Sequence, residues 1–417
     1  MLSVPMQQTL TKNPLNMVVI VAALGYFVDI YDLILFGIVR NPSLTELGYS
    51  GQQLLDIGVD LLNMQMFGML LGGIVWGILG DKKGRMSALF LTILIYSLAN
   101  IANGFVQNLS QYFALRFIAG FGLAGELGIG ITLVSEVMTK ESRGYGTALV
   151  SGVGIAGAVL GFLVTDLFNW RVAYWTGGAL GLVLLVLRIY VHESGMFGKL
   201  KEQKVKRGQF FSLFTNKKRF LKLLYCILIG MPVWYVIGIL VIFSSEFAKN
   251  VFHIQGEIIA GKSVMYHYIG ASLGSFITGL ISQYFRSRKK SIAIALVSLT
   301  IFIGVYFACF NVSAAVFYFV IFILGIAQGY WAVFITTAAE QFGTNLRATV
   351  ATTAPNFVRG STVPMTFLFR YLGGVPSVGL WISGIVVGGI VMFLSIFSLF
   401  RIEETFHKDL DYVEEIS

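Results

Sequence analysis

The segment GILGDKKGR at residues 77–85 separates two long apolar runs, and GLISQYFRSR at residues 279–288 echoes it in the second half of the chain. A second pair of segments lies further along, SEVMTKESRG at 135–144 and AEQFGTNLRA at 339–348. The two pairs are separated by nearly the same distance along the sequence. One such pairing can arise by chance, but two at matching offsets indicate a duplicated unit. Paired six-helix halves around a central site are a transporter architecture.

Apolar runs fill most of the remaining chain. A helix needs roughly 20 apolar residues to cross a bilayer, and backbone in lipid must be hydrogen-bonded internally, which favours helices. We expect twelve spans, at 16–39, 56–79, 87–106, 111–137, 144–166, 172–192, 222–245, 262–284, 290–310, 314–338, 348–372 and 377–400. The prediction is an all-α membrane protein with two pseudo-symmetric six-helix bundles. Its parts are an N-terminal bundle at 1–192, a cytoplasmic linker at 193–221, a C-terminal bundle at 222–401 and a cytoplasmic tail at 402–417.

Composition and charge agree with a membrane location. Hydrophobic residues make up 56% of the 417 residues and charged residues 12%, whereas soluble domains carry roughly 25% charged residues. Lysine and arginine gather at 82–85, 140–143, 199–222 and 286–290, all on the same side of the predicted spans. By the positive-inside rule both termini and the linker are cytoplasmic, in the cell (inner) membrane. This placement explains the net charge of +9 without a nucleic-acid partner.

No motif in the sequence indicates an enzyme, which would need a reactive centre. We find no phosphate-binding loop, no clustered metal-ligand spacing and no nucleophile elbow. Both cysteines, Cys226 and Cys309, stand in apolar runs, where they are expected to act as small core residues. We therefore expect no enzyme activity, no catalytic residue, no metal and no cofactor, and we expect a monomer.

The quoted segments carry a family resemblance. The segment at 77–85 resembles the loop between helices two and three of the major facilitator superfamily, and the resemblance covers nearly the whole chain. Within that superfamily, RFIAGFGLAGELGIGITLVSE at 116–136 and GYFVDIYD at 25–32 are similar to the metabolite:proton symporters, carriers of proline and betaine, citrate, 2-oxoglutarate and shikimate. Asp29 stands where that family more often has glutamate. The resemblance implies alternating access, with the substrate bound between the halves.

Charges in the repeated segments suggest a conformational latch on the cytoplasmic side. Such a network can hold one conformation and release in the other. We expect it to comprise Asp81, Arg85, Glu136 and Arg143 in the first half, and Glu340 and Arg347 in the second. Gln283 stands where the second copy would have the counterpart of Asp81, which predicts a weaker latch there.

Two carboxylates in the first span are candidates for proton coupling. Asp29 and Asp32 are three residues apart, hence nearly on one face of a helix. Ionisable groups at bilayer depth are costly and usually face a cavity or a partner, and close carboxylates raise each other's proton affinity. The alternative is a structural hydrogen bond to a neighbouring helix.

The fourth span adds Arg116 and Glu126. Ten residues separate them, about 15 Å along a helix, so Glu126 is expected near mid-membrane. It either carries the proton or pairs with a basic group across the cavity, and Arg116 either binds an anionic substrate or faces Asp29 and Asp32. A buried structural ion pair explains both equally well.

The eleventh span carries the strongest indication of an anionic substrate, Arg359, because a guanidinium matches a carboxylate with two hydrogen bonds. Pro355 and Pro364 are expected to loosen this helix and expose carbonyl groups. Asn356 and, in the first span, Tyr31 are further candidate substrate contacts.

Other polar residues in or near the spans have simpler explanations. His267 can relay protons, but a packing role is favoured. Asp56 and Asp60 lie near the outer end of the second span, where solvation or helix capping accounts for them.

The sequence thus predicts a secondary transporter that imports a small organic solute, a carboxylate-bearing metabolite, together with protons. The first alternative is an exporter or antiporter of a drug or secreted metabolite. Ala158 in the fifth span stands where many drug:proton antiporters have proline, which favours uptake. A second alternative, a transporter-like sensor, would be expected to carry a long soluble extension.

Overall fold

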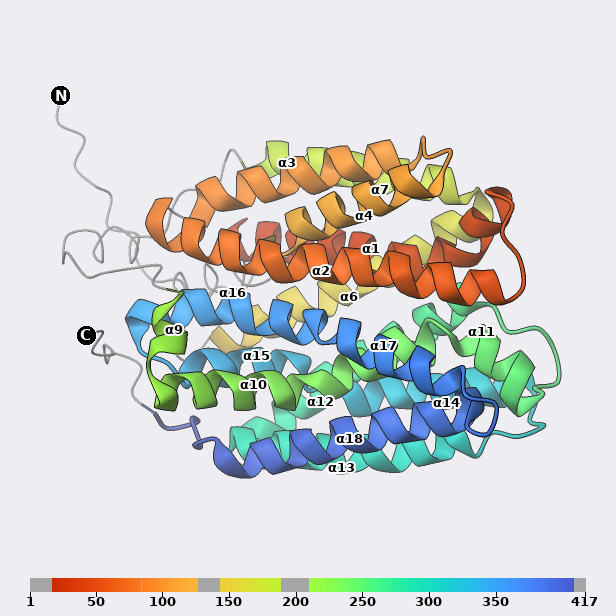
Figure 1. The fold of residues 1–417 in the computed structure, drawn as a ribbon. Coiled ribbons are helices and arrows are strands. Elements are labelled where there is room, and N and C mark those ends of the chain that lie inside the picture. Colours follow the sequence, from red (N-terminus) through yellow and green to blue (C-terminus); the bar gives the residue numbers. More distant parts are fainter. Residues whose placement is uncertain (1–16, 84, 127–142, 189–209, 409–417) are drawn as a thin grey trace.

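The computed structural model describes residues 17–83, 85–126, 143–188 and 210–408. These residues are nearly all helical and form two groups of long helices that run along a common direction (Figure 1). Helices from the first half of the chain fill the upper part of Figure 1, and helices from the second half fill the lower part. The predicted all-α architecture of two bundles is confirmed.

The N-terminal bundle consists of long, mostly uninterrupted helices. Its members are α1 (Met17–Glu46), α2 (Gln52–Lys83), α3 (Arg85–Asn103), α4 (Leu109–Leu123), α6 (Arg143–Leu167) and α7 (Trp170–Arg188). Asparagine side chains cap the starts of α4 and α7. The side chain of Asn108 accepts a hydrogen bond from the Gln111 amide at 3.0 Å, and that of Asn169 accepts one from the Val172 amide at 2.9 Å. Such caps satisfy amides that have no partner inside the helix.

The C-terminal bundle is more irregular. It begins with α9 (Ser212–Thr215), α10 (Lys217–Tyr235), the π-helix η1 (Val236–Val241), α11 (Ser244–Phe247) and the π-helix η2 (Ala248–Phe252). It continues with α12 (Ala260–Tyr284), α13 (Arg288–Phe307), α14 (Ala314–Gln328), α15 (Trp331–Glu340), α16 (Thr344–Gly360), α17 (Thr362–Gly373) and α18 (Gly379–Arg401). Asn216 caps α10, which therefore starts inside the stretch that the sequence assigned to the linker. Two of the expected single spans are each split, into α14 with α15 and into α16 with α17.

Close helix pairs repeat in the two halves. In α2, Gly68 lies against the backbone of Phe117 in α4, and in α12, Gly270 lies against the backbone of Phe322 in α14. A Cβ at either glycine would collide with a carbonyl oxygen, and small residues are what allow membrane helices to approach this closely. Across the two bundles, α2 packs on α16 and α6 packs on α12, again as equivalent pairs. The duplicated unit seen in the sequence is therefore present in the packing.

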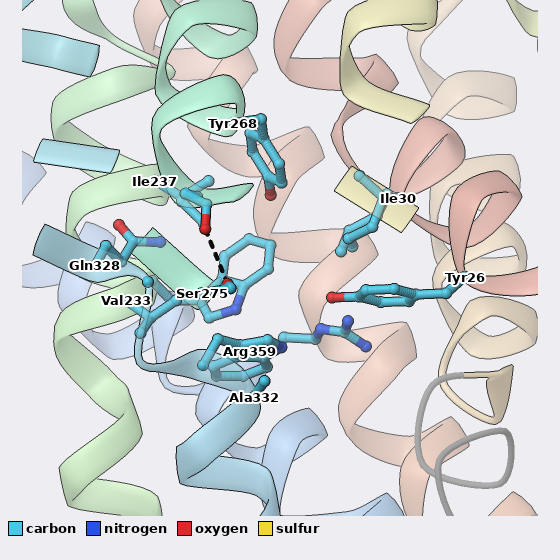
Figure 2. Close-up of a pocket in the computed structure, with 14 residues that line it drawn as sticks. Tyr26, Ile30, Val233, Ile237, Tyr268, Ser275, Gln328, Ala332 and Arg359 are labelled. Carbon is cyan, nitrogen blue, oxygen red and sulfur yellow. Dashed lines mark hydrogen bonds between the residues drawn. The ribbon is translucent and has the colours of Figure 1, made fainter. Parts of the chain in front are cut away.

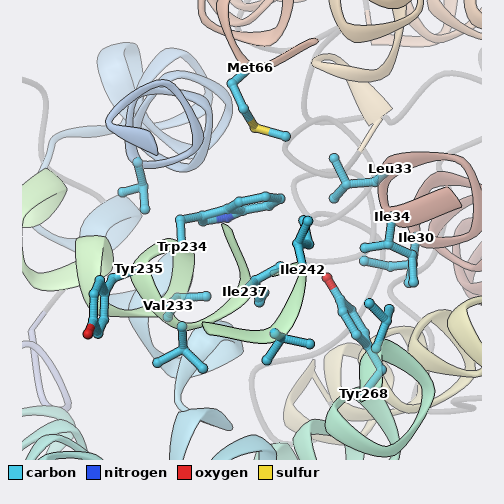
Figure 3. Packing of buried hydrophobic residues seen from close by; sticks show 14 of the residues in the cluster. Ile30, Leu33, Ile34, Met66, Val233, Trp234, Tyr235, Ile237, Ile242 and Tyr268 are labelled. Atoms are coloured by element: carbon cyan, nitrogen blue, oxygen red, sulfur yellow. The ribbon is translucent and has the colours of Figure 1, made fainter. Parts of the chain in front are cut away.

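An apolar contact surface joins the bundles (Figure 3). Ile30 and Leu33 of α1 face Trp234 of α10 and Ile237 of η1, all at most 4% exposed. Because lipid tails are as apolar as these side chains, close packing rather than transfer from water stabilises such a surface. Tyr235 turns to the opposite side of α10, where its hydroxyl donates to the Gly384 carbonyl of α18 at 2.7 Å.

Eight of the described helices are long and apolar enough to cross a membrane, and two shorter apolar helices lie at Ser87–Asn103 and Gly152–Leu167. The turn between α2 and α3, helix α9 and the end of α18 lie at one end of the molecule, and the α1–α2 and α17–α18 connections lie at the other (Figure 1). This is a multi-pass membrane protein.

Candidate functional site

A small cavity lies between the two bundles (Figure 2). Tyr26, Ile30 and Leu33 of α1 form its N-terminal wall, and residues of α10, η1, α12, α14, α15 and α16 form the rest. Its volume is about 40 Å³, enough for a few water molecules and too small for an organic solute unless the walls move. The bundles are therefore nearly closed around the site.

Arg359 brings a positive charge to this cavity from the last turn of α16. Its side chain is 1% exposed. Nη1 donates to Asn356 Oδ1 at 3.2 Å, Nη2 lies 3.8 Å from Asp29 Oδ2, and Nε has no hydrogen-bond partner among the described residues. The expected interruption of this span occurs at Ser361, beside Pro364, while α16 continues through Pro355. A guanidinium has five N–H donors, so much of the capacity of Arg359 is unused.

Asn356 positions Arg359 and does not line the cavity. Its Nδ2 donates to the Ala124 carbonyl of the N-terminal bundle at 2.7 Å and to the Thr352 carbonyl at 2.7 Å. Gly73 of α2 leaves the space that the Asn356 side chain occupies. Its donors and its oxygen are all engaged in this closed arrangement, and the contact of Asn356 with substrate stays a prediction.

Asp29 and Asp32 are both fully buried, but their surroundings differ. Asp29 faces Arg359 across the bundle interface. Asp32 turns toward Arg116, and Gly177 of α7 leaves the space for its carboxylate. By strict geometry neither carboxylate accepts a hydrogen bond within the described part of the chain, although the Asn100 side chain lies close to Asp32.

Glu126 forms a buried ion pair with Arg188. Arg188 Nη1 lies 3.1 Å from Glu126 Oε2, Nη2 contacts Oε1, and both side chains are 2% exposed. Gly25 of α1 makes room for the pair, since a Cβ there would collide with both residues. Both partners belong to the N-terminal bundle, so the expectation of a partner across the cavity is wrong. No sequence pattern indicates that Arg188, at the end of the apolar run of α7, has a buried acidic partner.

Arg116 and Tyr31 point into the N-terminal bundle. Arg116 donates to Asn100 Oδ1 at 2.9 Å and to Gln65 Oε1 at 3.4 Å, and its guanidinium lies 5.1 Å from the centre of the Tyr174 ring. Tyr31 donates to the Ala173 carbonyl at 2.8 Å. Neither residue lines the cavity. Arg116 faces Asp32, which agrees with the alternative expected for it, and contact of either residue with substrate stays a prediction.

The latch residues of the first half cannot be placed. Glu136 and the side chains of Asp81, Arg85 and Arg143 lie outside the described residues. In the second half, Glu340 Oε1 lies 3.5 Å from Arg288 Nη2, and Glu340 Oε2 accepts from the Thr405 hydroxyl at 2.7 Å. Arg347 Nη2 donates to the Phe342 carbonyl at 3.5 Å. The structure thus pairs Glu340 with Arg288, the last residue of the repeated segment 279–288.

Polar contacts between the bundles close the end of the molecule that holds the α1–α2 connection. Arg40 of α1 is fully buried and pairs with Glu246 of α11 at 2.6 Å. Arg370 of α17 pairs with Asp60 of α2 at 2.7 Å. The Asp60 side chain is 46% exposed, so solvation accounts for it as expected, and it pairs with Arg370 as well. These pairs must separate if the cavity is to open toward this end.

The sequence and the fold of this chain both resemble those of known proteins. The family described as Major Facilitator Superfamily matches residues 22–375. A Cupriavidus pinatubonensis protein named for 4-methylmuconolactone transport is 30% identical over 216 residues, 50% of each chain. A Bacillus subtilis protein named for niacin and nicotinamide transport is 30% identical over 188 residues, 44% of this chain and 46% of that one.

These alignments span about half of the relatives' length or less. Both relatives are named as transporters and not as enzymes. The solved structure of the proton:xylose symporter XylE matches with a TM-score of 0.70 at 16% identity, covering 95% of this chain and 97% of that one, which shows a shared fold. With a family match over most of its length and this fold, the chain belongs to the major facilitator superfamily.

Proposed function

We propose that this protein is a secondary transporter that imports a small ring carboxylate together with protons, by alternating access of its two bundles. The observation that carries the proposal is Arg359, a buried guanidinium in the wall of the inter-bundle cavity whose Nε has no hydrogen-bond partner among the described residues. A substrate carboxylate can accept two parallel hydrogen bonds from such a group.

The rest of the cavity favours a flat apolar body. Tyr26, Tyr268, Trp234 and Trp331 line it together with aliphatic side chains. A ring held between such side chains, with its carboxylate at Arg359, fits the common pattern of an apolar pocket with a few polar groups that set orientation. The relatives' names support the class, because niacin is an aromatic carboxylic acid.

Asp29 supplies the coupling in this proposal. When Asp29 is ionised it competes with the substrate for Arg359, which lies 3.8 Å away. When Asp29 takes up one proton, Arg359 is released for one substrate carboxylate. Proton and substrate then favour each other's binding, as reciprocal linkage requires. Because Asp29 belongs to one bundle and Arg359 to the other, the exchange of partners also alters a contact that joins the bundles. Asp32 and Glu126 complete the proposed buried network.

The proposal includes a membrane setting and a sequence of states. The protein lies in the cell membrane as a monomer with both termini cytoplasmic, consistent with the basic segments on one side of its spans. The pairs Arg40–Glu246 and Arg370–Asp60 close the outer end in the state described here. Asp81, Arg85, Glu136 and Arg143, with Glu340 and Arg347 in the second half, form the cytoplasmic latch that holds the opposite state.

The test is uptake of labelled nicotinate into proteoliposomes with an imposed pH gradient. Protein-free vesicles correct for passive entry of the neutral acid. We expect gradient-dependent uptake that unlabelled nicotinate abolishes and nicotinamide does not, because the amide lacks the charge that Arg359 binds. Arg359→Ala should remove binding of nicotinate, whereas Arg401→Ala, at the exposed end of α18, should leave it unchanged.

Two results would overturn parts of the proposal. Equal competition by nicotinamide would show that Arg359 does not recognise a carboxylate. Uptake with no dependence on the pH gradient, for nicotinate and for a panel of other carboxylates, would exclude proton symport. Net efflux against the solute gradient would instead assign the exporter alternative.

A further inference from the structure

The side of the cavity away from the Arg359 guanidinium carries its own polar groups. In Figure 2, Gln328 lies on the opposite side of the site from the guanidinium of Arg359 and the hydroxyl of Tyr26, with Ile237 and Val233 between them. The polar side chain of Ser275 also lines the cavity. The cavity therefore has a cationic side, an apolar middle and an uncharged polar side.

Gln328 reaches this position through a break in its span. Helix α14 ends at Gln328 and α15 begins at Trp331. The intervening Gly329 lies directly against the backbone of Gly274 and Ser275 in α12, where a Cβ would collide. Irregular backbone at membrane depth is tolerated where it is buried in protein or lines a cavity. The break therefore brings both Gln328 and Ser275 to the cavity wall.

The two side chains offer complementary hydrogen-bonding groups. Gln328 is 3% exposed. In Figure 2 its amide nitrogen lies on the side that faces the cavity, while its oxygen is turned away, and His267 lies close to the Gln328 amide. The Ser275 hydroxyl donates to the Ala271 carbonyl at 2.8 Å, so its remaining lone pairs can only accept. A hydroxyl on a ligand can accept from the Gln328 amide and donate to Ser275.

We propose that Gln328, with Ser275, is a specificity-determining subsite that binds a hydroxyl on the substrate at the end opposite its carboxylate. The inference rests on the proposed function, because Arg359 must hold the carboxylate for the far end of the ring to reach Gln328. The favoured substrate class is then a ring acid that bears a hydroxyl away from the carboxylate.

A competing explanation is a structural contact with His267. This histidine of α12 is fully buried beside Gln328, and neither of its ring nitrogens has a hydrogen-bond partner among the described residues by strict geometry. If Gln328 serves to satisfy His267, its replacement destabilises the protein without changing which ligand binds better. The experiment below separates the two roles.

The experiment measures inhibition of labelled nicotinate counterflow by 4-hydroxybenzoate, 4-fluorobenzoate and benzoate. The wild-type protein should bind 4-hydroxybenzoate at least about tenfold more tightly than 4-fluorobenzoate, since a site built for a hydroxyl discriminates against analogues without it. Gln328→Leu should reduce that ratio to about one while the inhibition constant of benzoate stays within about threefold. Gln52→Leu, exposed at the start of α2, is the control and should keep the wild-type ratio.

The outcomes distinguish a failure of the proposed function from a failure of the Gln328 subsite. If no acid inhibits the wild-type protein, the proposed function fails before the subsite is tested. If the acids inhibit but the hydroxyl gives no advantage, or Gln328→Leu preserves the advantage, the subsite is wrong and the carboxylate transporter stands. Should Gln328→Leu fail to fold, Gln328→Met and Ser275→Ala provide the same ratio, and unchanged ratios in both refute the inference.

Discussion

The two bundles hold their polar groups on differently built helices. In the N-terminal bundle, Asp29 and Asp32 of α1 and Arg188 of α7 are buried on helices that run without interruption through the described residues. Arg116 lies on α4, which ends at Leu123 before a turn. In the C-terminal bundle, the helices around the cavity are interrupted, by the π-helix η1, by the break between α14 and α15 and by the break between α16 and α17. Arg359 is the charged residue that this bundle contributes to the cavity wall.

This difference allows two similar halves of a proton-coupled transporter to take different roles. Continuous helices satisfy their own backbone, so they can hold buried charges at fixed positions and leave a proton site intact while the cavity changes shape. Interrupted helices can move locally and offer polar groups to a solute. We infer that the N-terminal bundle handles the proton and the C-terminal bundle recognises the substrate.

The largest effect is expected from breaking the Glu126–Arg188 pair of the N-terminal bundle. Arg188→Met leaves the Glu126 carboxylate buried without its partner, which typically costs about 3–5 kcal/mol. Thermal and denaturant unfolding in detergent should show this loss, and the double variant Glu126→Leu with Arg188→Met should recover most of it. Arg401→Met in the C-terminal bundle is the control, expected within about 0.5 kcal/mol of wild type. A single variant as stable as wild type would mean that the pair is not a fixed element of the bundle.

The next effect separates proton coupling from substrate binding. Asp29→Asn cannot take up a proton, so accumulation driven by the pH gradient should fall at least about 100-fold. Counterflow, which needs no net proton movement, should survive because Arg359 remains. Asp166→Asn, exposed near the end of α6, should leave both measurements unchanged. Equal loss of accumulation and counterflow would contradict the division of roles, because it would place Asp29 in substrate binding.

The sequence predicted the fold far better than the site, for a physical reason. Spans follow from apolar length, and the paired segments exposed the duplication. The rotation of each helix about its axis does not follow from either. Tyr31 and Arg116 were therefore assigned to the cavity, although they bond within their own bundle.

Two further residues show what sequence patterns cannot reveal. Arg188 ends an apolar run, where a long basic side chain ordinarily reaches the membrane surface, and its partner Glu126 is distant in sequence. Gln328 precedes Gly329 in a run that stays apolar on both sides, so nothing in the periodicity marks the break that places it at the cavity. Arg359 stands out in the sequence because an arginine inside an apolar span is rare. The structure places it at the cavity wall, and its contact with substrate stays a prediction.

A moderate effect is expected where the two bundles meet at the end that holds the α1–α2 connection, which we propose faces outward. Glu246→Gln removes the charge that pairs with Arg40 across the interface and should favour opening by about 1.4 kcal/mol, a tenfold change in population. The reporter is Leu33→Cys in the cavity wall, labelled from outside by a membrane-impermeant maleimide, because Cys226 and Cys309 are both buried. Labelling should accelerate about tenfold in Glu246→Gln, and Glu257→Gln, exposed at the same end, should show the wild-type rate. Unchanged labelling would indicate that this pair does not hold the bundles together.

The smallest effect tests a carboxylate that lies outside the membrane-spanning helices, at the edge of the C-terminal bundle. Glu404 follows α18 and accepts hydrogen bonds from the Ser287 hydroxyl and from the amides of Arg288 at 2.9 Å and Phe406 at 3.0 Å. Burial by itself raises the pKa of Glu404, but these hydrogen bonds outweigh it and leave the pKa below the ordinary 4.5.

Because the folded pKa of Glu404 is the lower one, its stabilisation is complete above the unfolded value and disappears as pH falls through the folded value. Glu404→Gln should therefore be less stable than wild type at pH 6, by less than about 1 kcal/mol for such an exposed group, and the difference should shrink below pH 4.5. Glu403→Gln is the control, since that side chain is 71% exposed and pairs with Lys408 at 3.2 Å. A difference that persists unchanged at low pH would mean that the shape of the side chain, and not its charge, holds the tail against α13. A carboxylate on this bundle would then contribute packing alone, in sharper contrast to the buried carboxylates of the N-terminal bundle.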